Sequence, residues 1–385
     1  MTCKIGIITI VRVNNYGAEL QAYATQNVLR DLGYDAEIID YLFYKHSRHI
    51  VTKGSKPLFK YSFTKKITEF LYPRISKYKN LFQGNGLDLQ RKQRFDAFHT
   101  ANTCFSKEYR SIEDLNTASM DYDAYIVGSD QVWNPGNYTS LDPYFLKFAP
   151  KGKRRISYAS SFGVSALPVE TQDYYKQSLG ELDFISVREE NAVKIVKDVS
   201  GRDAQWVLDP TLLMNADSWR KVAKYPEGLP QRYVLLYELT PCADLKRHAL
   251  QIASDKGCKV VRITKDANRV ESDDEVINIM DAGPAEFVGL FDKAEFVLTN
   301  SFHGTAFCIN FNRPFCVITP YRKDNNSRQK SLLNLFGLES RLLNEYDSLP
   351  QNDFLQIDYS NANKIMQLER EKSLHFLTTA INGYC

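Results

Sequence analysis

The sequence lacks several features that would place a protein in a class at once. Its seven cysteines are an odd number and form no CxxC pair, so neither a disulfide framework nor a paired-cysteine motif is indicated. No apolar run has the length of a membrane span, and the apolar segment 4–10 is too short for a signal peptide. We therefore expect reduced thiols and a cytoplasmic protein.

A strong charge of one sign is also missing. The formal net charge of +3 provides no strong field for nucleic acid, so we expect no nucleic-acid partner. Segment 60–94 is nevertheless rich in Lys and Arg and contains only two acids, Glu69 and Asp88. The segment is either a solvated face of an insertion, or a surface for peripheral contact with the inner face of an anionic membrane or with an acidic polymer.

Motifs of several enzyme classes are absent too. The six histidines are scattered without metal-ligand spacing, and there is no GxSxG elbow, Walker loop or GxGxxG turn. We therefore expect no metal and no cofactor. The composition is globular, with 43% hydrophobic and 25% charged residues, and the 385 residues suffice for about two domains.

Strands and helices alternate along most of the chain, which predicts an α/β protein with a parallel sheet in each of two halves. We expect a first domain at 1–210 with an irregular insertion at about 43–118, a second domain at 211–345, and a helical tail at 346–385 that packs back on the first domain. Two such Rossmann-like domains would face a central cleft. The predicted strands lie at 4–11, 35–41, 122–127, 155–160, 184–187, 206–208, 233–239, 258–263, 276–279, 295–298 and 315–319, and the predicted helices at 16–32, 191–199, 243–256, 284–293, 301–311 and 361–381.

A polar turn interrupts an apolar stretch near residue 300. Segment 295–298 has the pattern of a buried strand, 299–304 that of a turn, and 305–309 that of a helix. His303 is thus expected where a strand is followed by a helix N-terminus, the usual position of an anion site in an open α/β sheet. The alternative is that Ser301 merely caps the helix and His303 is an interior histidine.

Two polar clusters of the first half follow predicted strands and suit a hydroxyl-rich ligand. Asn15 and Tyr16 begin a helix after the first strand, and Asp130 and Gln131 follow the strand at 122–127. Amide and carboxylate groups of this kind hydrogen-bond sugar hydroxyls. The alternatives are an asparagine helix cap at the first cluster, and a helix cap with core packing of Trp133 at the second.

Cationic side chains follow two further strands. Arg188 comes directly after strand 184–187 and could clamp a carboxylate or phosphate, or instead form an ion pair with Glu189 or Glu190. The segment 321–328 supplies three cations after strand 315–319, on what we expect to be a loop. This inventory of one histidine, cations and amides suits the transfer of a small doubly anionic group to a hydroxyl compound.

Six short segments follow one another along the chain: Asn15-Tyr16-Gly17-Ala18, Val127-Gly128-Ser129-Asp130-Gln131-Val132-Trp133-Asn134, Ser157-Tyr158-Ala159-Ser160-Ser161-Phe162-Gly163, Ser186-Val187-Arg188-Glu189, Leu208-Asp209-Pro210-Thr211 and Thr299-Asn300-Ser301-Phe302-His303-Gly304. In this order they resemble the polysaccharide pyruvyl transferase family. The resemblance implies a GT-B-like pair of domains, phosphoenolpyruvate as the co-substrate, and a glycan or lipid-linked oligosaccharide as the acceptor of a pyruvate ketal. It also implies His303 as catalytic acid/base and Arg188 as a catalytic donor ligand.

One departure from the family pattern concerns Ser301, where many members carry an arginine. The predicted donor-binding residues therefore include substitutes for that cation on the next loop; they are Ser301, Gly304, Arg322, Lys323, Asn326, Ser327 and Arg328. The predicted acceptor-binding residues are Asn15, Tyr16, Asp130 and Gln131. Two other functions stay open: a nucleotide-sugar glycosyltransferase of the GT-B type, and a catalytically silent partner in glycan assembly.

Overall fold

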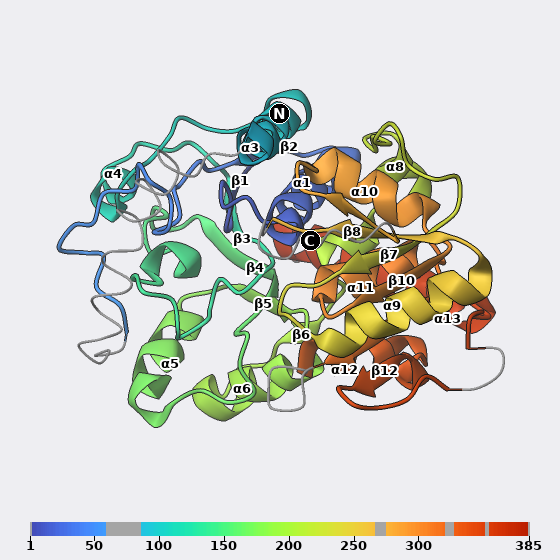
Figure 1. The fold of residues 1–385 in the computed structure, drawn as a ribbon. Coiled ribbons are helices and arrows are strands. Elements are labelled where there is room, and N and C mark those ends of the chain that lie inside the picture. Colours follow the sequence, from blue (N-terminus) through green and yellow to red (C-terminus); the bar gives the residue numbers. More distant parts are fainter. Residues whose placement is uncertain (1, 59–85, 266–274, 320–326, 351–353, 384–385) are drawn as a thin grey trace. The chain divides into compact units, whose positions relative to one another are not determined.

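The chain forms two compact units, and each contains one parallel sheet (Figure 1). The computed structural model describes residues 2–58, 86–265, 275–319, 327–350 and 354–383. The first unit comprises Met1–Gly84, Asn102–Leu213 and Glu369–Cys385, and the second comprises Asn85–Ala101 and Met214–Leu368. Residues 86–101, which the sequence suggested to be part of an insertion in the first domain, thus group with the second unit.

The first sheet has six parallel strands in the order β2-β1-β3-β4-β5-β6. Its strands are β1 (Lys4–Ile8), β2 (Asp35–Ile38), β3 (Ala124–Val127), β4 (Arg154–Ser160), β5 (Phe184–Val187) and β6 (Gln205–Trp206). The helical segments of this unit are α1 (Tyr16–Asp31), α4 (Ile112–Asn116), η1 (Asp142–Phe145), η2 (Val169–Thr171), α5 (Gln172–Gly180), α6 (Glu190–Ser200) and α7 (Pro210–Leu213). Helix α13 (Ser360–Asn382) begins in the second unit and ends in the first.

The second sheet also has six parallel strands, in the order β12-β11-β10-β7-β8-β9. Its strands are β7 (Tyr233–Tyr237), β8 (Lys259–Ile263), β9 (Val276–Ile279), β10 (Phe296–Thr299), β11 (Phe315–Thr319) and β12 (Leu342–Asn344). The helical segments are α3 (Gly86–Asn102), α8 (Ala216–Arg220), α9 (Ala243–Lys256), α10 (Pro284–Lys293), α11 (Phe302–Asn310), α12 (Ser327–Phe336) and η5 (Glu339–Arg341). The predicted α/β class with two parallel sheets is confirmed.

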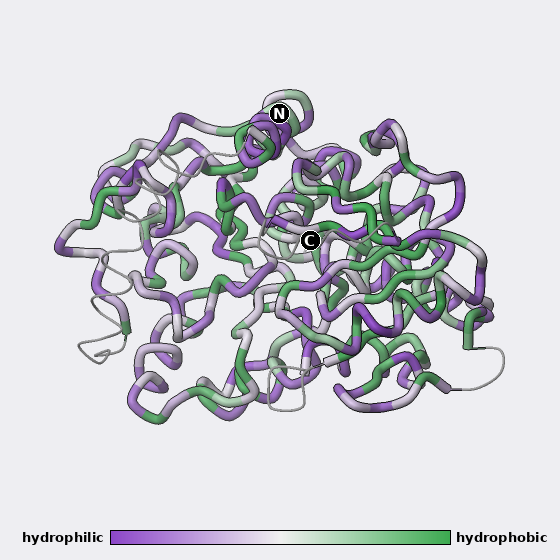
Figure 2. The backbone as a smooth tube through the Cα atoms, in the orientation of Figure 1, coloured by the Kyte–Doolittle hydropathy of each residue, from purple (hydrophilic) through white to green (hydrophobic). Residues whose placement is uncertain are grey.

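Helices cover both faces of the second sheet. Neighbouring residues of a strand point to opposite faces, so a strand can contact helices on both sides. Leu236 of β7 belongs to a cluster with the inner face of α9, whereas the next residue, Tyr237, packs its ring edge against Phe287 of α10. Both faces are therefore buried, and hydrophobic colouring follows these strands in Figure 2. Each fully buried Leu or Phe contributes about 1.5 to 3 kcal/mol to stability.

Local sequence signals set several helix ends. Asn15 accepts a hydrogen bond from the Ala18 amide and thereby starts α1. Pro284 occupies the first turn of α10, where its missing N–H costs no hydrogen bond. Gly257 ends α9 with a φ of 61°, a left-handed conformation that a glycine adopts without strain. These signals explain why the predicted bounds of α9 and α10 agree with the structure.

The order of the strands creates a topological switch point in each sheet. The chain leaves β1 toward β2 on one side and later returns to its other side with β3; in the second sheet, β8 and β10 lie on opposite sides of β7. At such a point the loops after the two central strands diverge to opposite faces and leave room for a ligand at the carboxyl ends. The loops after β1 and β3, and those after β7 and β10, are therefore the positions at which a site is expected.

The C-terminal part of α13 belongs to the first unit and is bonded to it by side chains. The Ser373 hydroxyl accepts a hydrogen bond from the Leu208 amide at 3.0 Å, and the Arg370 guanidinium donates to the Leu212 carbonyl at 2.6 Å. Burial lowers the pKa of Arg370 to about 10. Within the part of the chain that the structure describes, no helix combines the length and apolarity needed to cross a membrane.

We expect Gly289→Ala to destabilise the second unit, because α10 passes very close to the backbone at Lys224. A methyl group at residue 289 would lie 2.1 Å from the Lys224 carbonyl oxygen, and the Lys224 amide is held by the Ala285 carbonyl at 2.9 Å. Overpacking of this kind costs about 1 to 3 kcal/mol, which corresponds to a fall in melting temperature of about 3 to 8 °C by calorimetry. Gly180→Ala, which meets no atom within 4 Å, is the control and should cause no fall; an unchanged melting temperature for Gly289→Ala would contradict the packing.

Candidate functional site

The turn that carries His303 lies at the switch point of the second sheet, directly after β10. Ser301 is the N-cap of α11, and its hydroxyl accepts a hydrogen bond from the Gly304 amide at 3.2 Å. His303 is the second residue of the helix, has 9% of its surface exposed, and packs edge-on against the Phe302 ring at 5.3 Å. The helix cap by Ser301, which the sequence had offered as an alternative, is therefore present. It fixes the backbone conformation at His303.

Asn300 ties this turn to the loop that follows β7. Its side-chain amide donates to the Thr240 carbonyl at 2.7 Å, and its side-chain oxygen accepts from the Leu239 amide at 2.8 Å. The Thr299 hydroxyl adds a bond to the Tyr237 carbonyl at 2.6 Å. The two loops of the switch point are therefore held together by side chains from the β10 end, and the position of α11 relative to β7 is fixed.

Helix α12 brings a third segment to the same edge. The Gln329 amide in its first turn donates to the Asn300 carbonyl at 3.1 Å, and Gln329 is 5% exposed. Ser327 and Arg328, which precede Gln329, therefore begin a helix beside the Asn300 turn and do not lie on a loop as predicted. The other three predicted donor-binding residues of this segment lie outside the described residues; they are Arg322, Lys323 and Asn326.

A buried ion pair near the β7 end was not predicted. The Glu238 carboxylate pairs with the Arg262 guanidinium of β8, and its second oxygen accepts from the Cys242 amide at the start of α9 at 3.2 Å. Because both partners are buried, the pair holds the loop after β7 in one arrangement. A signal was available, since an acid directly after an apolar strand and an arginine inside one are both uncommon.

In the first unit, the Arg188 side chain is completely buried and surrounded by acceptors. The guanidinium contacts the Glu189 carboxylate at 2.9 Å, the Asp209 carboxylate at 2.9 Å, the Ser129 hydroxyl at 3.3 Å and the Asp130 carboxylate at 3.5 Å. Burial alone lowers the pKa of Arg188, but the three carboxylates outweigh it and raise the pKa above its ordinary value. The guanidinium therefore stays charged.

These contacts show the ion pair with Glu189 that the sequence had left open as an alternative. Contact between Arg188 and a donor stays a prediction, and the guanidinium has no exposed surface through which to make it. What its geometry supports directly is a positioning role: Arg188 holds the carboxylate of Asp130, which is 16% exposed, at the end of β3.

Backbone strain gathers at the carboxyl edge of the first sheet. Four residues there have positive φ angles: Arg12 (57°) and Asn14 (48°) in the loop after β1, Asp130 (74°) after β3, and Ala159 (52°) in β4. Residues other than glycine rarely adopt this region, and such strain is concentrated at functional sites. The tertiary structure therefore maintains backbone conformations at the β1/β3 switch point that the local sequence does not favour.

The other predicted acceptor-binding residues are partly occupied by structural contacts. Asn15 is exposed, although its side-chain oxygen caps α1, and Tyr16 is buried. The Gln131 side-chain oxygen accepts from the Asn134 amide at 2.7 Å. Trp133 is fully buried and stacks on Phe145 at 5.1 Å, so it is a core residue, as the alternative interpretation expected.

Asp209 is a buried acid that accepts hydrogen bonds from several residues at this edge. One of its oxygens accepts from Arg188 and from the Ser129 hydroxyl at 2.8 Å, and the other accepts from the Thr211 amide and hydroxyl. The Thr9 hydroxyl, after β1, donates to the Ser129 carbonyl at 2.8 Å. The sequence alone did not indicate a role for Asp209, because two of its partners, Arg188 and Ser129, lie about 20 and 80 residues away in the chain.

The described residues at the two edges do not form a metal site. Among the residues that the structure describes, no group of three or more His, Cys, Asp or Glu side chains could hold one. The second unit offers a histidine at a helix N-terminus, and the first offers a partly exposed carboxylate, that of Asp130. These groups can exchange protons and bind anions and hydroxyls.

Two parallel sheets with polar strand-to-helix turns at their switch points define an α/β protein of doubly wound architecture. The chain belongs to the polysaccharide pyruvyl transferase family, whose model matches residues 15–320. This family is one of transferases, so the chain is a member of a transferase family. No curated protein matches the sequence significantly.

Solved structures that resemble the chain differ strongly from it in sequence. UDP-N-acetylglucosamine 2-epimerase from Rickettsia bellii is 11% identical, with 99% of this chain and 98% of that chain covered and a TM-score of 0.46. UGT89C1 from Arabidopsis thaliana, complexed with UDP-L-rhamnose, is 13% identical over 97% and 94% of the chains with a TM-score of 0.43. ADP-heptose lps heptosyltransferase II from E. coli is 10% identical over 96% and 99% with a TM-score of 0.38.

We expect Asp209→Asn to lower the free energy of unfolding by about 3 kcal/mol, because it removes a buried charge partner of Arg188. Asp198→Asn is the matched control: Asp198 forms an exposed ion pair with Lys194, and its loss should cost no more than about 0.5 kcal/mol. Urea denaturation of both variants measures the difference. Equal losses in the two variants would refute the buried charge cluster.

Proposed function

We propose that this protein transfers pyruvate from phosphoenolpyruvate to two hydroxyls of a glycan sugar, forming a ketal and releasing phosphate. The observation that carries the proposal is the family match across residues 15–320, which includes the His303 turn at the switch point of the second sheet. The acceptor is a glycan or a lipid-linked oligosaccharide. The expected cytoplasmic location, at or near the inner face of the membrane, belongs to the same proposal.

The donor carries a carboxylate and a phosphate, and the His303 turn has groups suited to anions. The first turn of α11 presents backbone amides at the positive end of the helix dipole, and a helix N-terminus of this kind is favourable for negative charge. Arg328, in the first turn of α12, is the neighbour in sequence of Gln329, whose side chain bonds to the Asn300 carbonyl. We assign donor binding to this edge, with Ser301 and Gly304 fixing its backbone. Arg328 is the described residue that best replaces the arginine missing at Ser301.

The reaction needs one proton moved in each of two steps. In the first, a sugar hydroxyl oxygen bonds to the central carbon of phosphoenolpyruvate, its proton is taken up, and the methylene carbon receives a proton to become methyl. In the second, another hydroxyl bonds to the same carbon, the phosphate leaves with the electron pair of its ester bond, and the hydroxyl proton is removed. His303 is the proposed shuttle for these protons, because an imidazole both accepts and donates protons near neutral pH.

Acceptor binding is assigned to the β1/β3 switch point of the first unit. The Asp130 carboxylate is partly exposed there and oriented by Arg188, and a carboxylate can accept hydrogen bonds from two sugar hydroxyls. Asn15, at the start of α1, and Gln131 contribute amides, and Tyr16 an aromatic ring, at the same edge. In this proposal, Arg188 acts through Asp130, and its own contact with the donor is a separate prediction.

We expect His303→Ala to reduce phosphate release from phosphoenolpyruvate by about 100- to 10,000-fold, the usual contribution of general acid/base catalysis. His375→Ala is the control, because His375 is exposed on α13, and its rate should not change. A phosphate assay with a glycan acceptor measures both variants. A loss below about threefold would remove His303 from the chemistry.

Thermal melting supplies the control for folding and for donor identity in the same experiment. The His303→Ala variant should melt at the wild-type temperature. Phosphoenolpyruvate, added at about 100 times the dissociation constant of its complex with this variant, should stabilise the variant by about 2.7 kcal/mol. Stabilisation by a nucleoside diphosphate in place of phosphoenolpyruvate would favour a glycosyltransferase. No stabilisation by either would favour a catalytically silent family member.

We expect Asp130→Asn to raise the KM for the glycan acceptor by about tenfold or more, because a hydrogen bond to a charged group contributes about 1.5 to 3 kcal/mol. Asparagine tolerates the positive φ at this position, so the backbone should be retained and the KM for phosphoenolpyruvate should change little. Asp203→Asn, with a 92% exposed side chain, is the control. Steady-state kinetics with the acceptor varied test the assignment, and equal acceptor KM values in wild type and Asp130→Asn would refute it.

A further inference from the structure

A basic loop with exposed aliphatic side chains follows β2 in the first unit. Residues 41–58 contain four cations, two histidines and no Asp or Glu. Near the middle of this loop, Ile50 and Val51 are 52% and 76% exposed. One exposed aliphatic residue is ordinary on a protein surface, but two adjacent ones among cations combine the apolar area and the positive charge that strengthen binding to an anionic membrane.

Hydrogen bonds hold the backbone of this loop in one arrangement. The Ile50 amide donates to the Arg110 carbonyl at 2.8 Å, and the Gly54 amide donates to the Glu113 carboxylate at 3.2 Å. Both ends of the segment 50–54 are thus fixed to the segment that contains Arg110 and Glu113. The fold therefore presents the Ile50 and Val51 side chains to the outside from a tethered backbone.

Two guanidinium groups converge on one carboxylate beside Ile50. Arg48 contacts Glu108 at 2.7 Å, Arg110 contacts the same carboxylate at 2.6 Å, and both arginine side chains are half-exposed. Two cations less one acid leave the cluster with an excess of one positive charge. Each guanidinium has five N–H groups, so the cluster retains donors for the oxygens of a further anion. Lys53, three residues after Ile50, is exposed as well.

The loop lies beyond the carboxyl edge of the first sheet. Parallel bridges join Ile38 and Tyr41 to segment 105–109, which therefore runs alongside the end of β2 and continues past it. Arg110 follows directly, and its carbonyl holds the loop. Because β2 is the neighbour of β1 in a parallel sheet, the loop is on the side of the unit to which acceptor binding is assigned above.

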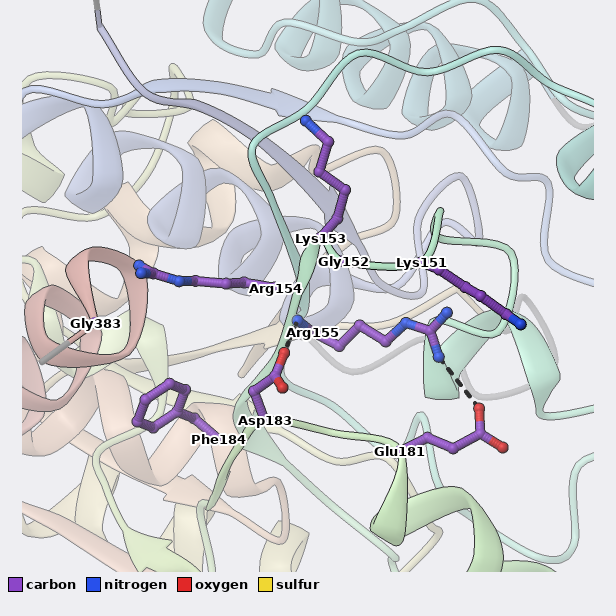
Figure 3. Close-up of a pocket in the computed structure, with 9 residues that line it drawn as sticks. All are labelled: Lys151, Gly152, Lys153, Arg154, Arg155, Glu181, Asp183, Phe184 and Gly383. Atoms are coloured by element: carbon purple, nitrogen blue, oxygen red, sulfur yellow. Dashed lines mark hydrogen bonds and ion pairs between the residues drawn. The ribbon is translucent and has the colours of Figure 1, made fainter.

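A second basic surface of this unit lies at the opposite, amino edge of the sheet and differs from the loop. It surrounds a pocket where β4 and β5 begin, and its Lys151 and Arg154 side chains extend in opposite directions (Figure 3). Arg155 pairs there with Glu181 at 3.2 Å. This surface has cations without a shared focus, so it serves as the comparison for a test of the loop.

We propose that Arg48, Ile50, Val51, Lys53 and Arg110 form a surface that docks the first unit on an anionic membrane. The two aliphatic side chains enter the boundary between headgroups and acyl chains, and the three cations contact lipid phosphates. The aliphatic pair favours a bilayer as the partner, because an acidic polymer would engage the cations alone and leave Ile50 and Val51 in water. Residues 59–85, which follow the loop, lie outside the described residues and are not part of this surface.

Docking on this side presents the acceptor edge to molecules anchored in the bilayer. It therefore favours a lipid-linked oligosaccharide over a free glycan as the acceptor. This step rests on the proposed function, whereas membrane binding itself does not.

Sedimentation of the full chain with vesicles, without phosphoenolpyruvate or acceptor, tests the docking surface. Wild type should bind phosphatidylglycerol vesicles and not phosphatidylcholine vesicles. The double variant Ile50→Ser, Val51→Ser should bind about tenfold or more weakly, because two aliphatic side chains no longer enter the bilayer. Val169→Ser is the control, because Val169 is 80% exposed on η2 of the same unit, and it should bind as wild type does.

Charge reversal tests the cationic part of the surface. Lys53→Glu should weaken binding by about tenfold or more, because it places a negative charge at an anionic membrane. Lys151→Glu makes the same change at the amino-edge surface of Figure 3 and should bind as wild type does. All substituted side chains are exposed, so equal melting temperatures should show that the variants fold.

Three results would overturn the docking surface. Wild type does not bind phosphatidylglycerol vesicles; or the control variants lose as much binding as the loop variants; or Lys53→Glu loses binding while the double aliphatic variant does not. The last result would assign the loop to an acidic polymer.

Activity measurements separate docking from the proposed reaction. His303→Ala should bind vesicles as wild type does, although its phosphate release is slow. In the double aliphatic variant, the KM for a lipid-linked acceptor in phosphatidylglycerol vesicles should rise about tenfold, and the KM for a soluble glycan should not change. Vesicle binding by a wild type that releases no phosphate would refute the proposed function alone. An unchanged KM for the lipid-linked acceptor would refute the link between docking and the acceptor.

Discussion

Parallel strand pairing is the constraint on which both units depend, because it brings every carboxyl end in a sheet to one edge. The strand orders then place β1 beside β3 and β7 beside β10, although more than 50 residues separate the members of each pair in the chain. The turns at Asp130 and His303 follow directly from these pairings. The positions of these turns therefore depend on sheet topology, and the helices that cover the sheets hold that topology by burying both faces.

Buried polar side chains then fix the turns that the topology brings together. In the first unit, the charge of Arg188 is compensated by three carboxylates, and those bonds orient Asp130, whose backbone is strained. In the second unit, Asn300 performs the corresponding task with neutral hydrogen bonds to the loop after β7. A charged cluster fixes its geometry strongly, because removing one partner leaves a buried charge uncompensated. A neutral amide does so at lower cost and leaves the adjoining helix N-terminus electrostatically favourable for an anion.

The turns that carry the candidate site residues could be located from the sequence, whereas the contacts of their side chains could not. The His303 turn was predicted because a polar interruption between an apolar strand and an apolar helix is a local pattern. Arg188 was recognised as important, but its burial among acids depends on Asp209 and Ser129, which are distant in the chain. Gln329 was missed because helix α12 has no strong signal at its start, and its bond to Asn300 appears only when β11 lies beside β10. Core packing of Trp133 was only one of the alternatives for its segment, and the complete burial of this side chain became visible in the structure alone.

The sequence by itself determined the α/β class, most strand and helix positions and the family, because hydrophobic period, helix caps and short motifs are local properties of the chain. Strands β5, β9 and β11 agree with their predicted bounds for this reason. Only the tertiary structure decided the order of the strands, the charge compensation of Arg188 and the pocket at the start of β4 and β5. Each of these depends on which distant residues meet, and that is set by the packing of the whole unit.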